Sequence, residues 1–293
     1  MKLFQRLSSS MLFAVILLAL LVYASLSPPP SRDAAFLLDA LIKERGGLDF
    51  LGDANARQVG LEDYRKELGA AREAEQLDTD KTHLELIQAI ADAIIREAIN
   101  VYPAAQHWDW EVHLIDSKTV NATCREGGKI IVYSGLIKAL EEHPDQIATV
   151  LGHEVAHAIL GHNRSSLSKT GLVKATTWII AESLKMGPQR RTQAEEMLKL
   201  ALLHPQTRRQ EIEADILGVE LAVRAGYDYA QASEVWRRFM ALSKRSEDGI
   251  DFLANREASF TNDHPIDGER IRLIEKLAPK VGKLQNSLKT GQP

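Results

Sequence analysis

Two histidines four residues apart, with a glutamate directly after the first, occur in the stretch LGHEVAHAILGH at 151–162. On a helix, residues i and i+4 lie on one face, so His153 and His157 can bind one metal ion together. Glu154 is displaced by about 100° around the helix axis, which suits a base acting on water rather than a metal ligand. This H-E-x-x-H arrangement in an apolar context predicts a zinc site. The alternative is a pair of core histidines whose polar atoms are satisfied by neighbours.

A catalytic zinc ion needs a third protein ligand and an open position for water. The extended motif H-E-x-x-H-x-x-G-x-x-H does not supply this ligand, because Leu160 replaces the glycine and Asn163 the last histidine. His162 is one residue out of register with that motif. We therefore interpret His162 as a surface or helix-end residue.

The stretch RRQEIEADILG at 208–218 is a better source of the third ligand. Glu211 and Asp215 stand at i and i+4, on one helical face. Glu211 can then bind zinc, while Asp215 accepts a hydrogen bond from a ligand histidine and fixes its tautomer. Glu213 is a competing ligand that points elsewhere on the helix if Asp215 supports the site. A solvated acidic face is the alternative interpretation of this stretch.

Helices must position most of these residues. Apolar residues recur at helical spacing over 83–103 and predict a helix with one apolar face. Capping and breaking residues indicate further helices at 136–142, 144–161, 206–224, 229–244 and 266–279. Ala214 and Gly218 are small and let their helix approach another closely. Runs of β-branched and aromatic residues at 108–115 and 128–135 predict a small sheet, so we expect an α+β, mostly helical fold.

Composition limits the partners and cofactors. The chain has 293 residues and is 45% hydrophobic, enough to bury a core. Its 36 basic and 40 acidic residues leave a formal charge of −4, so no global field attracts nucleic acid, and we expect no nucleic-acid partner. A single cysteine, Cys124, excludes an internal disulfide or a multi-cysteine metal site, and we expect it to be a small buried residue.

The N-terminus resembles an export signal. Lys2 and Arg6 precede an apolar run of about 14 to 16 residues, the length of a signal-peptide core. We expect a signal peptide or signal anchor at 1–27, which in the anchored form associates the protein with a membrane. A proline linker and short helices are expected at 28–82, and a polar tail at 281–293.

These motifs together resemble metallopeptidase family forty-eight over roughly residues 83–276. Its members combine H-E-x-x-H with E-x-x-A-D, which fall here on 153–157 and 211–215. NATCREGGKIIVYSG also resembles a family segment, although Thr123 and Glu126 stand where an aromatic residue and a proline are usual. RAGYD and HPIDGERI resemble two further family segments. One N-terminal apolar run without internal spans is similar to the exported branch that includes bacterial and mitochondrial quality-control peptidases.

The resemblance implies a zincin-like metallopeptidase domain at 83–280, mostly helical, with a small sheet beside the active-site helix. It implies one Zn²⁺ per chain, bound by His153, His157 and Glu211, with Glu154 as the catalytic base. It further implies a role for His264, either as a donor to the oxyanion or in the open zinc position.

Two other parts of the chain are expected to support the site. By the resemblance, Arg270 helps to hold the site together. The segment Lys129, Ile130, Ile131, Val132, Tyr133 is expected to be an exposed edge strand that pairs with an extended substrate through main-chain hydrogen bonds. An ordinary internal strand is the alternative. The segment 171–187 is too polar to span a membrane, and it covers the cleft, rests on the bilayer surface or packs against the core.

We therefore expect a zinc endopeptidase in the periplasm or cell envelope of a Gram-negative bacterium, acting on misfolded or unassembled proteins. The first alternative is a chaperone or assembly factor that retains zinc and rarely cleaves, although Glu154 would then have no purpose. The second is a mitochondrial stress peptidase. It is less favoured because the N-terminus is short and poor in arginine for a transit peptide.

Overall fold

The computed structural model describes residues 53–183, 185–202, 204–247, 260 and 264–290. The expected signal peptide or anchor at 1–27, and residues 28–52 of the expected linker and helical segment at 28–82, lie outside these residues. Most of the described residues fall into two compact units, one made of 55–162 with the described part of 211–290, the other of the described part of 163–210. Within the described residues, no helix combines the length and apolar character needed to cross a membrane.

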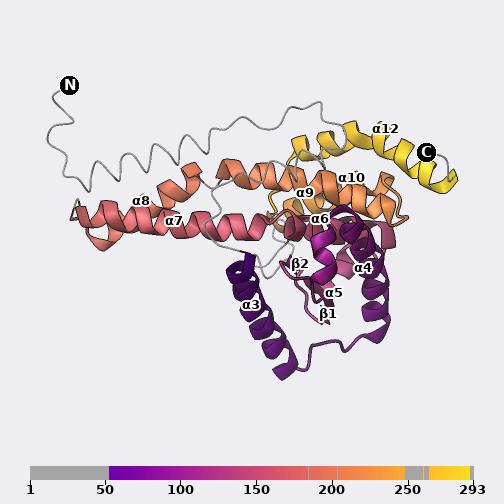
Figure 1. The fold of residues 1–293 in the computed structure, drawn as a ribbon, viewed down its shortest axis with the longest axis horizontal. Helices are drawn as coiled ribbons and strands as arrows, with labels where there is room; N and C mark the ends of the chain where they lie inside the picture. The colour runs from indigo at the N-terminus through magenta and orange to yellow at the C-terminus, as the bar shows by residue number, and fades with distance from the viewer. Residues whose placement is uncertain (1–52, 184, 203, 248–259, 261–263, 291–293) are drawn as a thin grey trace. The chain divides into compact units, whose positions relative to one another are not determined.

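The first unit holds the sheet and most of the helices (Figure 1). In chain order its elements are α3 (Asp53–Glu73), α4 (Lys81–Val101), the 3-10 helix η2 (Pro103–His107), β1 (Glu111–Ile115), β2 (Ala122–Arg125), β3 (Lys129–Tyr133), α5 (Ser134–Ala139), α6 (Pro144–Ile159), the later part of α9 (His204–Arg224), α10 (Ala230–Glu247) and α12 (Gly268–Thr290). The second unit contains α7 (His162–Ser183) from Asn163 onward, and α8 (Pro188–Leu202). The predicted α+β, mostly helical fold is confirmed.

The sheet has three strands in the order β1-β3-β2. β3 pairs in parallel with β1 and antiparallel with β2; Ile131, for example, lies opposite His113 on one side and Thr123 on the other. The prediction that Lys129 to Tyr133 forms an exposed edge strand is therefore wrong, because both edges of β3 are used within the sheet. Sequence reasoning missed β2, whose residues ATCR include a single β-branched side chain.

Helix α6 is the buried centre of this unit. It begins at Pro144, a favourable first residue for a helix, and every residue from Gln146 to Ile159 is buried. It packs against α4, β2 and α10. A helix that is enclosed on all sides provides a rigid, water-poor setting for the polar residues it carries.

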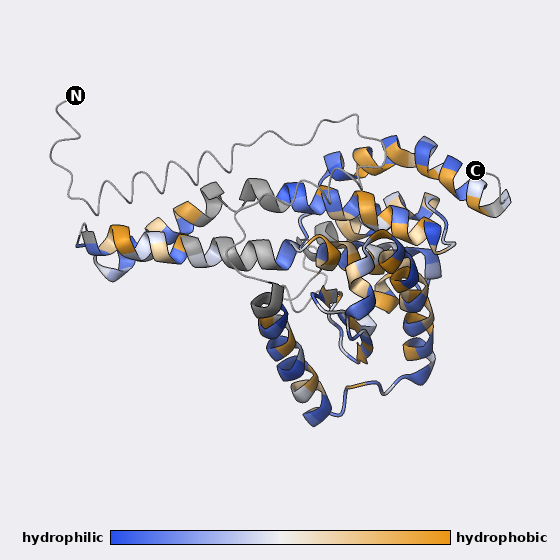
Figure 2. Cartoon of the chain, in the orientation of Figure 1, coloured by the Kyte–Doolittle hydropathy of each residue, from blue (hydrophilic) through white to orange (hydrophobic). Residues whose placement is uncertain are grey.

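The predicted helix over 83–103 is confirmed as α4, whereas α12 extends past its predicted end at 279. Bands of hydrophobic and hydrophilic residues alternate along α12 in Figure 2. This pattern matches its buried residues Ile271, Ile274 and Val281, which share one helical face. Part of the segment predicted to form short helices is instead the single 21-residue helix α3.

Candidate metal centre

Four side chains of the first unit converge on one point. His153, His157, Glu211 and His264 each offer a ligand atom, and these atoms all lie within 4.8 Å of one another. Nε2 of His153 lies 3.0 Å from Nε2 of His157 and 3.3 Å from Oε2 of Glu211. Three imidazoles and one carboxylate are donors that suit a divalent metal such as zinc. The donor set therefore fits a metal ion.

A contact between two glycines brings the two ligand-bearing helices together. A Cβ at Gly152 on α6 would lie 2.5 Å from the carbonyl oxygen of Gly218 on α9, and a Cβ at Gly218 would lie 2.6 Å from the backbone nitrogen of His153. The predicted close approach through Gly218 is thus observed. Glu211, almost two turns earlier on α9, consequently reaches the histidines of α6.

Glu154 lies beside the cluster and is 4% exposed. Its Oε1 forms no hydrogen bond with the described residues and lies 3.3 Å from Nε2 of His264. Burial raises the pKa of the carboxyl, while the positive charges of neighbouring histidines and a hydrogen bond from the backbone of Cys124 lower it. A raised pKa suits a carboxyl that must both accept and return a proton.

Asp215 and Arg270 form a buried pair behind the cluster. Nε and Nη2 of Arg270 donate to Oδ2 and Oδ1 of Asp215, both at 2.8 Å, and Nη1 lies 3.1 Å from Oε2 of Glu211. Burial raises the pKa of Asp215, but Arg270 outweighs it and holds that pKa below its usual range. Asp215 in turn lies 3.0 Å from Nδ1 of His153. Asp215 therefore lies next to a candidate ligand histidine, where the prediction of a hydrogen bond to that ring put it, but the geometry at Nδ1 of His153 is not that of a hydrogen bond.

His264 lies at the open side of the cluster. Its ring stacks on Phe260 with centroids 4.4 Å apart, and its Nδ1 lies 3.1 Å from Oε2 of Glu211 and 3.2 Å from Nε2 of His153. Nδ1 thus lies among the candidate ligand atoms. Of the two roles considered for His264, this geometry favours the fourth ligand position.

The interpretation of His162 as a surface or helix-end residue is wrong in one respect. His162 does begin α7, but it is 5% exposed, and its Nδ1 lies 2.9 Å from Nδ1 of His157. Its Nε2 lies 3.2 Å from Oε2 of Glu213, so the competing ligand Glu213 points away from the cluster. The comparison with the extended motif asked only whether His162 binds the metal directly. It could not reveal that His162 contacts Nδ1 of His157, the ring nitrogen that faces away from the cluster.

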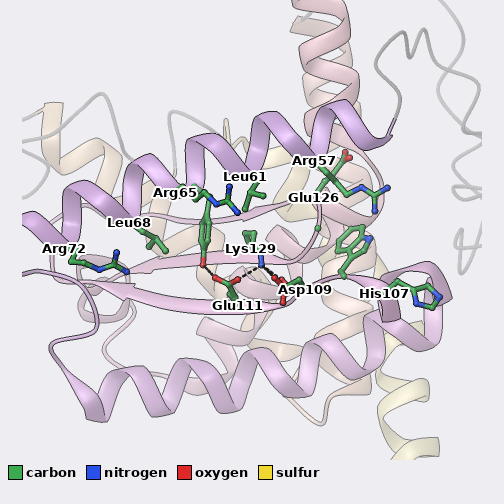
Figure 3. Close-up of a pocket in the computed structure, with 13 residues that line it drawn as sticks. Arg57, Leu61, Arg65, Leu68, Arg72, His107, Asp109, Glu111, Glu126 and Lys129 are labelled. Atoms are coloured by element: carbon green, nitrogen blue, oxygen red, sulfur yellow. Dashed lines mark hydrogen bonds and ion pairs between the residues drawn. The ribbon is translucent and has the colours of Figure 1, made fainter.

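The side chains of Lys129 to Tyr133 lie outside the cluster. Ile130, Ile131 and Val132 are buried in the core, and Nζ of Lys129 donates to Oδ2 of Asp109 at 2.8 Å. Lys129 lines a cavity of about 460 Å³ between α3 and the sheet, in which Asp109 and Glu111 surround its ammonium group (Figure 3). None of the residues lining this cavity belongs to the metal cluster.

The edge strand beside the cluster is β2, which packs against α6. Alternate residues of an antiparallel strand direct their main-chain groups to opposite sides. Tyr133 donates to the carbonyl of Asn121, which places the main-chain groups of Ala122 and Cys124 on the outer side. The backbone contact between Cys124 and Glu154 agrees with this assignment.

Comparison with known proteins gives a consistent result. Residues 82–278 match the sequence model of peptidase family M48. The chain is 31% identical over 172 residues to the mitochondrial metalloendopeptidase OMA1 of Schizosaccharomyces pombe, covering 59% of this chain and 48% of the relative. It is 24% identical over 237 residues to human OMA1, with 78% and 42% covered, and 28% identical over 160 residues to Metalloprotease LoiP of Escherichia coli, with 54% and 58% covered. The chain thus spans about half the length of these relatives.

Proposed function

The chain belongs to peptidase family M48, as its motifs predicted, and we propose on this basis that it is a zinc-dependent endopeptidase. The observation that carries the proposal is the convergence of His153, His157, Glu211 and His264 within 4.8 Å, with the buried carboxyl of Glu154 beside them. A purely structural cluster has no need of a buried carboxyl whose Oε1 forms no hydrogen bond with the described residues.

We assign zinc to His153, His157 and Glu211, with His264 in the fourth position at rest. Zinc, when bound, acts as a Lewis acid and lowers the pKa of water. Glu154 accepts a proton from the attacking water and returns it to the leaving nitrogen of the peptide. Its burial supports the first step, because a carboxylate whose pKa is raised accepts a proton more readily than one in water.

The substrate in this proposal lies along the outer edge of β2. The outward main-chain nitrogens of Ala122 and Cys124 donate to Oδ1 of Asn121 and to Glu154, so the substrate would lie against this edge rather than join the sheet as a further strand. Because Cys124 contacts Glu154, a peptide in this position would pass next to the base. We propose unfolded or misassembled proteins as substrates.

We place the protein in the periplasm or cell envelope of a Gram-negative bacterium, acting in protein quality control. The support is the sequence of its N-terminus and its similarity to two Escherichia coli metalloproteases, LoiP and YcaL. Retention of the N-terminal apolar run would tether the protein to the inner membrane. A chaperone or assembly factor with little proteolysis is the second candidate, favoured by the position of His264 among the ligand atoms.

Cleavage of casein by the purified full chain tests the proposal, with zinc content measured in parallel. We expect the unaltered chain to cleave and Glu154→Gln to retain zinc while losing activity about 10²- to 10⁴-fold. Zinc in both proteins without cleavage by either would favour the chaperone. Equal cleavage by both would remove Glu154 from the mechanism.

A further inference from the structure

Both ring nitrogens of His157 have a neighbour. Its Nε2 lies among the ligand atoms, 3.3 Å from Oε1 of Glu211. Its Nδ1, on the opposite side of the ring, lies 2.9 Å from Nδ1 of His162. Both histidines are buried. The contact between His157 and His162 is therefore shielded from water that could replace it.

Hydrogen positions in this chain of contacts follow from the metal. Two ring nitrogens at hydrogen-bond distance attract only if one of them carries a hydrogen. A histidine that gives the Nε2 lone pair to a metal carries its hydrogen on Nδ1, so His157 donates and His162 accepts. The hydrogen of neutral His162 is then on Nε2, which lies 3.2 Å from Oε2 of Glu213. One hydrogen per ring satisfies both contacts.

The other ligand histidine of α6 is supported in a different way. Nδ1 of His153 faces a carboxylate directly, Asp215 at 3.0 Å. His157 instead contacts the ring of His162, which in turn contacts the carboxylate of Glu213. Asp215 and Glu213 are two residues apart on α9, the helix that also provides Glu211. One turn of α9 thus supplies the candidate ligand Glu211 and also the two carboxylates, Asp215 and Glu213, that support the histidines of α6.

We infer that His162 is a positioning residue of the metal centre, which accepts the Nδ1 hydrogen of His157 and is itself oriented by Glu213. This inference rests on the proposed zinc site. Such outer partners fix the tautomer and orientation of a ligand ring, and their loss typically weakens metal binding about 10- to 100-fold. His162 therefore acts on the metal through His157 and does not bind it.

Two amide variants separate this role from simple packing. In His162→Asn, the side-chain oxygen can occupy the place of Nδ1 and accept from His157. In His162→Gln, the amide lies nearer the place of Nε2, beside Glu213, and leaves Nδ1 of His157 without an acceptor. Both are polar amides of similar size. Thr149→Val serves as a control, since it keeps the size of the side chain and removes the hydrogen bond that Thr149 donates to the carbonyl oxygen of Asp145 on the same helix.

Competition with a chelating dye measures zinc affinity for the full chain and each variant, with thermal melts as a check on folding. We expect His162→Gln to bind zinc about 10- to 100-fold more weakly, and His162→Asn to remain within about threefold of the unaltered chain. Thr149→Val should bind zinc normally even if its melting temperature falls.

Equal affinities for the Asn and Gln variants would overturn the inference, because a packing role does not distinguish the positions of the two amides. A full loss in His162→Asn, with a normal thermal melt, would overturn it as well. Failure of the unaltered chain to bind zinc would overturn the proposed zinc site together with the inference. Normal binding by the unaltered chain, with no effect at His162, would overturn the inference alone.

Discussion

Gly152 and Gly218 meet backbone to backbone, so that a Cβ on either residue would lie within about 2.6 Å of a main-chain atom of the other helix. The contact joins α6, which carries the two histidines, to α9, which carries Glu211 and Asp215. The spacing of these four polar residues therefore depends on two residues that have no side chain.

Gly218→Ala is expected to destabilise the protein and to weaken the metal site, because main-chain atoms cannot move aside as a flexible side chain can. Overpacking of this kind costs about 1–3 kcal/mol. Chemical denaturation and zinc content measure the two effects. Gly69→Ala on α3 is the matched control: its Cβ would meet no atom within 4 Å, and it should be neutral or slightly stabilising. A normal zinc content in Gly218→Ala would contradict the argument.

Arg270→Leu is expected to cost about 3–5 kcal/mol, since it leaves the buried carboxylates of Asp215 and Glu211 without their guanidinium partner. Urea denaturation measures the loss. Arg237→Leu is the control, because Arg237 pairs with Glu234 and Glu275 at the surface, where such pairs contribute at most about 1 kcal/mol. Equal losses of stability in the two variants would show that the buried ion pair of Arg270 contributes no more than the surface pairs of Arg237.

The sequence predicted the parts of this centre that depend on helical periodicity. The spacing of His153 and His157 gave α6, and that of Glu211 and Asp215 gave a second helix facing it. Residues whose positions depend on tertiary packing were not predicted. The pairing of β3 on both sides requires β2, which carries little strand propensity. The burial of His162 follows from the approach of α9 and Glu213, which lie far along the chain.

The metal-free protein is expected to lose stability as the pH falls below about 6.5. Burial lowers the pKa of both His157 and His162 in the folded state. Below the ordinary histidine value of about 6.5, the unfolded chain therefore binds protons that the folded chain does not, and stability decreases as pH decreases. The pKa of His153, raised to about 9, has the opposite effect between pH 6.5 and 9, where only the folded chain is protonated at this residue; well below 6.5 both states are protonated and His153 adds little to the slope.

Urea denaturation of the chelator-treated protein at pH 5 to 6.5 tests this expectation, with a slope of up to about 2.7 kcal/mol per pH unit for two histidines. His162→Asn should remove about half of the slope, because Asn does not titrate. Thr149→Val is the control, since it removes a hydrogen bond of α6 and no titratable group, and it should leave the slope unchanged. A slope that is the same in all three proteins would assign the pH dependence to other groups.

His264→Ala separates the two roles considered for this residue. Its Nδ1 lies 3.1 Å from Glu211 and 3.2 Å from His153, as expected of a fourth ligand that fills the position needed by substrate. Removal of the ring should then weaken zinc binding several-fold and increase casein cleavage per zinc-loaded molecule. If His264 instead donates to the oxyanion, its removal should leave zinc affinity unchanged and reduce cleavage about 10²- to 10³-fold.

His83→Ala, at a histidine paired with Asp80 outside the cluster, controls for the loss of an imidazole. Because the two roles move zinc affinity and turnover in different directions, measuring both quantities on the same protein decides between them.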